Sequence, residues 1–391
     1  MSSTHSMSRL EAARRREVTE LDAEILDAIG RGWETPLSDD EFDRLARAIF
    51  AHQHRFIPAY RQLCQLHGVS APADVESWRV IPPVPAGAFK VGRWATFPEE
   101  AETAAFRTSG TTVGTPGVHR FETLALVNAA ILPAARRFLL PDRGSIRFLF
   151  LGPAPGAAPD SSLVHMFAVF REALGAPGSR FLFPAGPRGA IAPDEIAAAL
   201  DTALRAGEPV LVAGPAIAFL RVLEALGGES WSLPEGSRAM VTGGFKGLRD
   251  AADPEALANA VAARLGIPAS HQVQEYGMTE LSSQYYDERL RREFGLPIEP
   301  SEDGGGDGAA TFVEPPWARV RVVDPRTGRD LPPGQIGALV HVDLANRGSA
   351  VAIQTSDLGS RRGPSVFALR GREADAEARG CSLAVDLWLG G

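Results

Sequence analysis

The stretch VLVAGPAIAFLRVLEAL, residues 210–226, has the pattern that decides the fold class. Val210 to Ala213 are apolar and are followed by glycine and proline, after which Leu220, Leu223 and Leu226 recur at helical spacing. A short apolar run bounded in this way predicts a buried strand, and the leucine spacing predicts one face of a helix. The stretch therefore predicts one strand followed by one helix.

The same order recurs on both sides of this stretch. Phe148 to Leu151 and Met240 to Thr242 are each followed by glycine or proline and then by a helical stretch. Strands that alternate with helices predict a largely parallel sheet covered on both faces. We therefore expect an α/β core over residues 101–300.

The pattern changes after SEDGGGDG (301–308), which we expect to be an exposed loop. WARVRVVD (317–324) alternates with period two, and IGALVHVDL (336–344) is rich in β-forming residues. These runs predict a β-rich, antiparallel or barrel-like subdomain over residues 301–360, followed by a short C-terminal tail over 361–391.

The first hundred residues have a helical pattern and then a connector. We expect helices over residues 8–30 and 38–67, the second beginning with Ser38 and Glu41 at capping-box spacing. RVIPPVPAGAFK (79–90) contains too much proline for the interior of an element, so it predicts an ordered connector. The expected inward face of the second helix contains Phe42, Leu45, Ile49 and Phe50.

The composition argues against several classes of protein. The 391 residues include 40 Lys and Arg against 48 Asp and Glu, a net charge of −8, which argues against a nucleic-acid partner held by a basic surface. Cys64 and Cys381 are the only cysteines, too few for a disulfide framework or a cysteine-rich zinc site. The N-terminus lacks a signal-peptide core, and no stretch reaches the roughly 20 apolar residues that span a bilayer. We expect a soluble, cytoplasmic protein of two or three domains, without a membrane span.

Four short motifs carry residue types that bind charged ligands. The first is TSGTTVGTPG (108–117), which is either a surface turn or a loop that curls around an anion. It lacks the lysine of a Walker A loop, so binding would depend on backbone N–H groups and hydroxyls. The residues that would contribute are Thr108, Ser109, Gly110, Thr111, Thr112 and Gly114.

The second motif is QEYGMTELSSQYYD (274–287). Tyr276 can stack on a purine, Thr279 can hydrogen-bond a phosphate, and Glu280 can hold Mg²⁺ through oxygen. The alternative is a helix that begins at Thr279 as N-cap, next to a buried tyrosine.

The third and fourth motifs lie near the C-terminus. In QTSDLG (354–359), Asp357 lies just beyond an expected strand and can accept hydrogen bonds from two ribose hydroxyls, or else it forms an Asx turn. The fourth motif is LRGREADAEARGCSLAVDLWL (369–389), in which Arg372 follows a glycine and can reach a phosphate. Cys381, two residues after Arg379, is either an inert small side chain or a thiolate nucleophile.

The order of the four motifs resembles the adenylate-forming enzyme superfamily, whose members use ATP to activate a carboxylate as an acyl-adenylate. Within it, the chain resembles the acyl-protein synthetase (LuxE-like) family over roughly residues 40–389. The matching pieces also include IPPVPAGAFK, His119 after the loop, VTGGFKG (241–247) and RGCSLAVD. The resemblance implies an adenylate-forming α/β fold and adenylation of a carboxylic acid of the fatty-acid class. It further implies transfer of the acyl group to Cys381 and delivery to an acyl reductase or another acceptor.

The resemblance also implies a role for each site residue, with ATP and Mg²⁺ as cofactors. The superfamily's phosphate-loop lysine is replaced by Gly117, which leaves His119 or Arg120 to assist, and the short tail stands where relatives have a further domain. The alternatives are transfer to a diffusible thiol or amine such as coenzyme A, and a non-catalytic interaction module. By this resemblance, the loop of residues 108–115 would bind the phosphates, Thr279 would also bind a phosphate, and Glu280 would bind Mg²⁺. Asp357 would bind the ribose, Arg372 would bind the ribose or a phosphate, and Cys381 would accept the acyl group. The residues that would surround the adenine are Gly243, Gly244, Tyr276, Gly277 and Met278.

Overall fold

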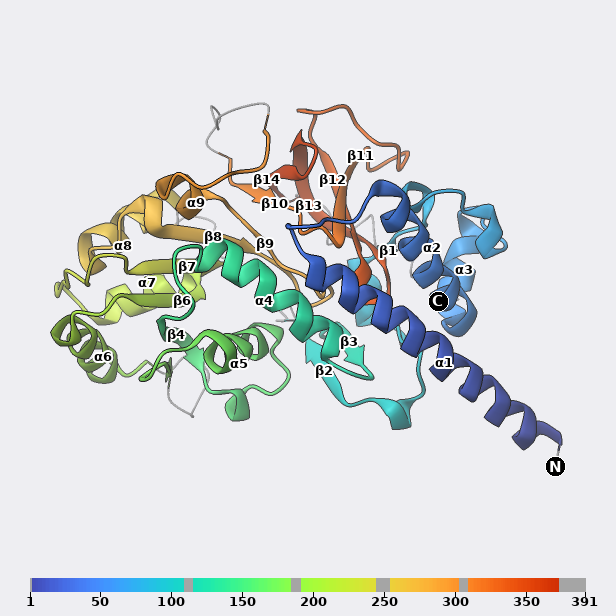
Figure 1. Ribbon diagram of the computed structural model, residues 1–391, viewed down its shortest axis with the longest axis horizontal. Helices are drawn as coiled ribbons and strands as arrows, with labels where there is room; N and C mark the ends of the chain where they lie inside the picture. The colour runs from blue at the N-terminus through green and yellow to red at the C-terminus, as the bar shows by residue number, and fades with distance from the viewer. Residues whose placement is uncertain (1, 109–114, 184–190, 244–253, 302–308, 373–391) are drawn as a thin grey trace.

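The computed structural model describes residues 2–108, 115–183, 191–243, 254–301 and 309–372, with the backbone alone for residues 2–10 (Figure 1). One large sheet runs through the molecule in the strand order β11-β12-β13-β14-β10-β9-β8-β7-β6-β4-β5. Its two halves differ in strand direction, as the change of sequence pattern predicts.

Five strands form the parallel half, in the order β8-β7-β6-β4-β5. Alternate side chains of β4 face opposite layers: Phe148 and Phe150 pack with α4 and α5, whereas Leu149 and Leu151 pack with α6, α7 and α8. The predicted α/β core, with helices on both faces of a parallel sheet, is confirmed. The strands are β4 (Arg147–Pro153), β5 (Arg180–Phe183), β6 (Val210–Pro215), β7 (Arg238–Thr242) and β8 (Gln272–Tyr276). The helices are α4 (Ala125–Leu139), α5 (Ser162–Leu174), α6 (Pro193–Ala206), α7 (Ala216–Ala225) and α8 (Pro254–Leu265).

The antiparallel half joins the same sheet, because β9 pairs antiparallel with β8 on one side and with β10 on the other. The β-rich region is therefore a continuation of the sheet. It extends beyond residue 360, so residues 361–372, expected to belong to the tail, lie on strands and the turn between them. The elements are β9 (Tyr285–Tyr286), α9 (Arg289–Glu293), β10 (Thr311–Val313), β11 (Ala318–Val323), β12 (Gly337–Asp343), β13 (Ala352–Gly363) and β14 (Val366–Arg372).

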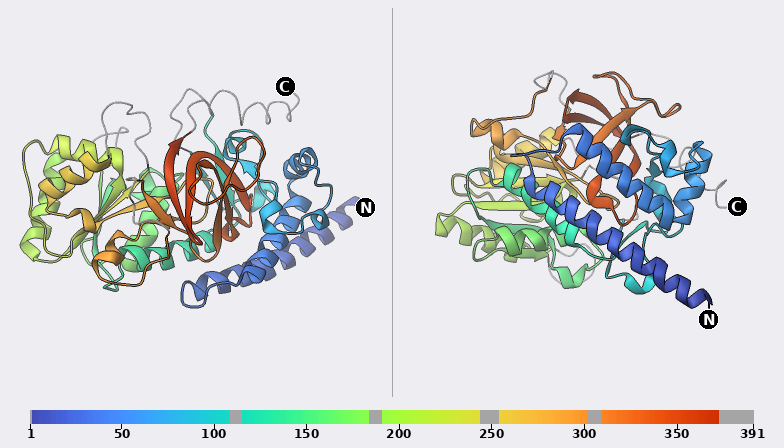
Figure 2. Two further views of the ribbon diagram at one scale, coloured as in Figure 1. Left: turned by 90° about the horizontal axis from the view of Figure 1, so that it is seen from above. Right: turned by 45° about the vertical axis from the view of Figure 1, so that its right-hand side comes forward.

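The N-terminal helices pack beside this half of the sheet, and α1 also lies along α4 (Figures 1 and 2). The predicted capping box of Ser38 and Glu41 is present. The single helix expected over 38–67 is wrong: Ile57 has extended backbone (φ −109°, ψ 100°), and Pro58, which has no N–H to donate, begins a new helix. The helices are α1 (Ser2–Arg31), α2 (Asp39–Phe56) and α3 (Pro58–Leu66).

Smaller elements complete the chain. β2 (Ala104–Arg107) and β3 (Val118–Phe121) form a separate two-stranded sheet. In the sequence they flank the first motif, residues 108–117, which we call the glycine-rich loop. β1 (Val84–Pro85) pairs with β13. The 3₁₀ turns are η1 (Pro72–Asp74), η2 (Trp78–Val80), η3 (Ala86–Lys90), η4 (Glu99–Ala101), η5 (Pro155–Ala157), η6 (Ala269–His271) and η7 (Leu344–Asn346).

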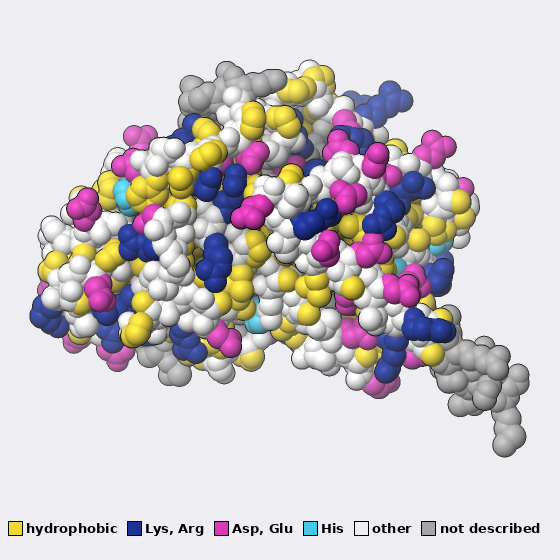
Figure 3. All heavy atoms as spheres, in the orientation of Figure 1, with side chains coloured by type: hydrophobic (Ala, Val, Ile, Leu, Met, Phe, Trp, Pro, Cys, Tyr) yellow, Lys and Arg dark blue, Asp and Glu magenta, His cyan; other side chains and the backbone are white. Residues whose placement is uncertain are grey.

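The surface carries charges of both signs. Figure 3 shows Lys and Arg side chains interspersed with Asp and Glu side chains across one face of the molecule. Among the described residues, none of the helices combines the length and the apolar character needed to cross a bilayer.

Candidate functional site

Three of the four motifs meet at one place, where the two halves of the sheet join. The Tyr276 hydroxyl, at the end of β8, donates a hydrogen bond of 2.8 Å to Asp357 Oδ2. Arg372 Nε donates to the other carboxylate oxygen of Asp357, at 2.5 Å. Asp357 was expected just beyond a strand, but it lies inside β13, where it pairs with Arg372 on β14. The strand register therefore places the carboxylate beside the guanidinium.

Tyr276 is buried in an aromatic cluster, with 8% of its surface exposed. Its ring stacks on His341 at 5.6 Å between centroids and 24° between planes, and the other rings close to it are those of Tyr285, Phe312 and Phe367. Burial raises the pKa of Tyr276 well above its usual value, so the hydroxyl keeps its proton and acts as a donor. The alternative hypothesis for this motif combined a buried tyrosine with a helix that begins at Thr279. The tyrosine is buried, but the predicted helix is wrong, because a turn without helix connects β8 to β9.

Segment 343–349, which begins at the last residue of β12, clamps the turn that begins at Gly277 through hydrogen bonds. Asp343 accepts hydrogen bonds from the backbone N–H of Ser282 (3.0 Å) and the hydroxyl of Ser283 (2.8 Å). Asn346 Nδ2 donates to the Glu280 carbonyl oxygen at 2.8 Å, and the Ser282 hydroxyl donates to Asn346 Oδ1 at 2.5 Å. Because the turn is not part of a helix or strand, these bonds hold its shape, and they fix the backbone of Glu280.

A buried glutamine on α2 holds the clamp in turn. Gln53 Nε2 donates to the carbonyl oxygens of Asn346 (2.8 Å) and Arg347 (3.1 Å), and Gln53 Oε1 accepts from the Val351 N–H (2.9 Å). The Gln53 side chain is fully buried. The N-terminal helical region therefore supports the turn from behind.

His119 on β3 connects the strand that follows the glycine-rich loop to the same turn. Its Nδ1 lies 2.9 Å from the Thr279 carbonyl oxygen and its Nε2 lies 2.8 Å from the Ser349 hydroxyl. A carbonyl can only accept, so Nδ1 carries the proton and Nε2 accepts from Ser349. Burial lowers the pKa of His119 to about 4. A neutral imidazole with both nitrogens bonded to protein is suited to positioning the turn rather than to contacting a phosphate.

The base of the glycine-rich loop is closed by Thr108. Its hydroxyl accepts from the Gly117 N–H at 2.8 Å, and its own N–H donates to the Gly117 carbonyl at 3.0 Å. Arg120, the other expected helper, is paired with Glu102 at 2.9 Å. Seven of the predicted site residues lie outside the described residues: Ser109, Gly110, Thr111, Thr112, Gly114, Gly244 and Cys381.

The glycines at the ends of β7 and β8 allow close approach to the backbone. Gly243 has φ +71°, and among the described residues no atom would lie within 4 Å of a Cβ added there. A Cβ at Gly277 would lie 2.6 Å from Oε1 of the buried Glu275, which also accepts from the Thr242 hydroxyl. Burial raises the pKa of Glu275 to about 7.

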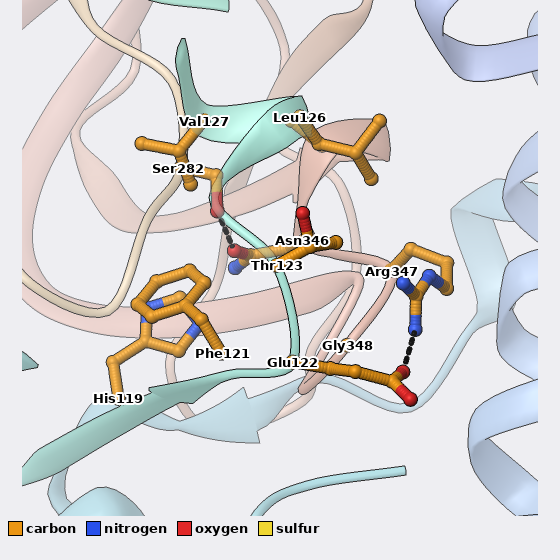
Figure 4. A pocket seen from close by; sticks show the side chains of 11 residues that line it. His119, Phe121, Glu122, Thr123, Leu126, Val127, Ser282, Asn346, Arg347 and Gly348 are labelled. Atoms are coloured by element: carbon orange, nitrogen blue, oxygen red, sulfur yellow. Dashed lines mark hydrogen bonds and ion pairs between the residues drawn. The ribbon is translucent and has the colours of Figure 1, made fainter. Parts of the chain in front are cut away.

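A small cavity lies between His119, Ser282 of the turn that follows β8, and residues 345–348 (Figure 4). Its volume of about 20 Å³ suits a single water molecule, so it holds neither a nucleotide nor an acid. Its lining includes Ser282, which hydrogen-bonds Asn346, and Arg347, which lies 3.7 Å from Glu122.

Solved structures of adenylate-forming ligases have this fold. The chain is similar to 2-hydroxyisobutyryl-CoA ligase in complex with 2-HIB-AMP and CoA, at a TM-score of 0.56 and 15% identity, covering 87% of this chain and 72% of that one. It is also similar to ATP-bound MatB from Rhodopseudomonas palustris (TM-score 0.44, 19% identity, 69% of this chain and 48% of that chain). A further similar structure is O-succinylbenzoate coenzyme A synthetase (MenE) from Bacillus subtilis with ATP and magnesium ion (TM-score 0.46, 17% identity, 69% and 50%). The chain thus spans about half the length of MatB and MenE.

The fold therefore places the chain in the structural class of the adenylate-forming ligases. The sequence profile of the acyl-protein synthetase LuxE family matches residues 13–389, so the chain belongs to that family. Both resemblances inferred from the sequence are confirmed. No curated protein matches the chain.

Proposed function

We propose that this protein uses ATP to activate a carboxylic acid as an acyl-adenylate and then carries the acyl group as a thioester on Cys381. The observation that carries the first step is the meeting of Tyr276, Asp357 and Arg372, which come from three separate motifs, at one carboxylate. Membership of the acyl-protein synthetase family supports the same reaction.

Asp357, Gly243, Tyr276 and Arg372 would recognise the nucleotide. Each oxygen of Asp357 still has a lone pair for a ribose hydroxyl after bonding Tyr276 or Arg372. The adenine would lie against the Gly243 backbone and the exposed part of Tyr276, which is 8% exposed because its ring also stacks on His341. Arg372, whose side chain is 46% exposed, can turn toward the ribose or a phosphate. These contacts position ATP so that the acid attacks the α-phosphorus, and pyrophosphate leaves.

The donor set of the turn fits a magnesium ion, which prefers few carboxylates together with phosphate oxygens. Glu280 would hold the ion through its carboxylate, and the ion would neutralise phosphate charge. The clamp on the Glu280 carbonyl fixes the backbone that carries this side chain. Thr279, whose hydroxyl lies 3.4 Å from that of Ser162, would contribute a hydroxyl to a phosphate.

The second step uses the tail. Cys381 follows Arg372 by nine residues, and an extended chain of that length spans at most about 30 Å. That reach would let the thiolate attack the acyl carbonyl carbon of an adenylate at the site, breaking the bond to the phosphate oxygen and releasing AMP. The thiol proton passes to solvent. The resulting thioester would then be delivered to an acyl reductase or another acceptor.

Pyrophosphate release followed by intact-mass measurement tests this function. The full-length protein is incubated with ATP·Mg²⁺ and a panel of carboxylic acids of different chain length. We expect pyrophosphate release, and a mass increase equal to one acyl group that hydroxylamine removes. Pyrophosphate release without covalent loading, and with product formed only when coenzyme A is added, would replace the second step with transfer to a diffusible thiol. No release with any acid would contradict the first step.

A further inference from the structure

His341 lies in the middle of β12 and is fully buried between two tyrosines. Its Nε2 lies 3.3 Å from the Tyr276 hydroxyl and its Nδ1 lies 3.0 Å from the Tyr285 hydroxyl. Its ring also stacks on that of Tyr276. None of the four motifs contains His341.

The protons in this chain of contacts can be assigned in one direction. The Tyr276 hydroxyl donates its hydrogen bond to Asp357, whose carboxylate can only accept, so the Tyr276 oxygen is the acceptor for His341 Nε2–H. Nδ1 of the neutral ring then accepts a hydrogen bond from the Tyr285 hydroxyl. Burial lowers the pKa of His341 to about 4 and raises those of both tyrosines, so these protonation states hold at neutral pH. The result is a chain of hydrogen bonds, each donated in the same direction, from Tyr285 through His341 and Tyr276 to Asp357.

We infer that His341 is a positioning residue for nucleotide binding, acting through Tyr276 on the carboxylate of Asp357. This inference rests on the proposed function, which gives Asp357 the ribose. A hydroxyl held by both a donor and an acceptor fixes the direction of its own bond, so the carboxylate is ordered before the nucleotide arrives. Binding then costs less in lost side-chain freedom.

Titration calorimetry of the full-length protein with ATP and Mg²⁺ tests the inference without requiring the identity of the acid. In His341→Phe, an aromatic ring is retained but both hydrogen bonds are lost, and we expect the Kd for ATP to rise about tenfold. In His341→Gln, the amide N–H₂ can replace Nε2–H, and we expect most of the affinity to return. In Tyr285→Phe, only the hydrogen bond to His341 Nδ1 is removed, so we expect a smaller rise in the Kd for ATP, about threefold.

Phe367→Leu is the matched control. Phe367 packs edge-on against both tyrosines and His341, with ring centroids 5.4 to 6.1 Å apart, but it makes no hydrogen bond through its side chain. Thermal unfolding should show both His341→Phe and Phe367→Leu to be destabilised, whereas the Kd should rise only in His341→Phe. If His341→Phe does not fold, Tyr285→Phe and His341→Gln carry the comparison.

Two results would overturn the inference while leaving the proposed function intact. One is wild-type ATP affinity in His341→Phe and Tyr285→Phe. The other is an equal loss of affinity in Phe367→Leu and His341→Phe, because that would assign His341 a packing role only. A wild-type protein that neither binds ATP nor releases pyrophosphate would instead overturn the proposed function itself.

Discussion

The Tyr276 hydroxyl and the Asp357 carboxylate are joined by a 2.8 Å hydrogen bond across 81 positions of sequence. Tyr276 ends the last parallel strand, and Asp357 lies within a strand of the antiparallel half. The bond therefore links the two halves of the sheet at the place where we propose that adenine and ribose bind. A substitution at either residue is expected to disturb recognition of both parts of the nucleotide.

Asp357→Ala is expected to raise the KM for ATP much more than the KM for the acid. The variant removes the proposed ribose acceptor, and it also leaves Tyr276 and Arg372 without the partner that they share. We expect at least a tenfold rise, about 1.4 kcal/mol, in pyrophosphate-release titrations. Asp357→Asn, which keeps one acceptor oxygen, should show a smaller rise. An unchanged KM for ATP in Asp357→Ala would show that the ribose lies elsewhere.

Glu280→Gln is expected to lower pyrophosphate release by roughly 100-fold, because a carboxamide neutralises no metal charge. The clamp bonds the Glu280 carbonyl oxygen, which the variant keeps. Thermal unfolding of the variant checks that the protein is still folded. Near-normal release over a range of Mg²⁺ concentrations would remove Glu280 from the metal site.

Cys381→Ala is expected to abolish stable acyl loading while acyl-adenylate formation continues. Forming the adenylate needs no sulfur, whereas the thioester does. Cys64→Ala is the matched control, since Cys64 is buried in α3 and burial raises the pKa of its thiol to about 12. Intact-mass measurement should find the acyl group on Cys64→Ala and not on Cys381→Ala. A Cys381→Ala protein that still carries the group would argue for another acceptor.

His119→Asn is expected to destabilise the protein more at pH 7.5 than at pH 5. The pKa of His119 is lowered to about 4 in the folded protein, so between about pH 6.5 and 4 the unfolded chain binds the proton and the folded chain does not. The stability that His119 contributes is thus complete above about pH 6.5 and is lost as the pH falls. The difference from wild type should shrink by about 2 kcal/mol between pH 7.5 and pH 5. Denaturant titrations at both pH values measure it, and a constant difference would mean that His119 is not buried in its neutral form.

The fold could be predicted largely from local pattern. Apolar runs such as Val210 to Ala213 must be covered on both faces, and their alternation with helical stretches indicates a parallel sheet with helices on each side. The break at Ile57 and Pro58 was missed, although proline rarely continues a helix. The position of Asp357 inside a strand could not be predicted. QTSDLG has the composition of a polar turn, and the sequence does not show which groups bond its side chains.

Recognition of the site depended on resemblance, and the residues that support the site left only a weak signal in the sequence. Asp343, Asn346 and Ser349 act through hydrogen bonds to residues far away in the sequence. The only signal was the presence of several polar residues in DLANRGS directly after a strongly apolar strand. The pattern of a single strand cannot indicate which distant turn those residues will hold.

The Gln53 side chain has a consequence for how this protein can be divided. A fragment starting after the connector would contain every signature motif, yet it would lack the amide that holds the Asn346 and Arg347 carbonyls. It would also lose Asp22, which pairs with Arg347 at 2.7 Å. The N-terminal helices are therefore not a detachable module, and exchanging them between homologues would require residues 22, 53 and 343–349 to be exchanged together.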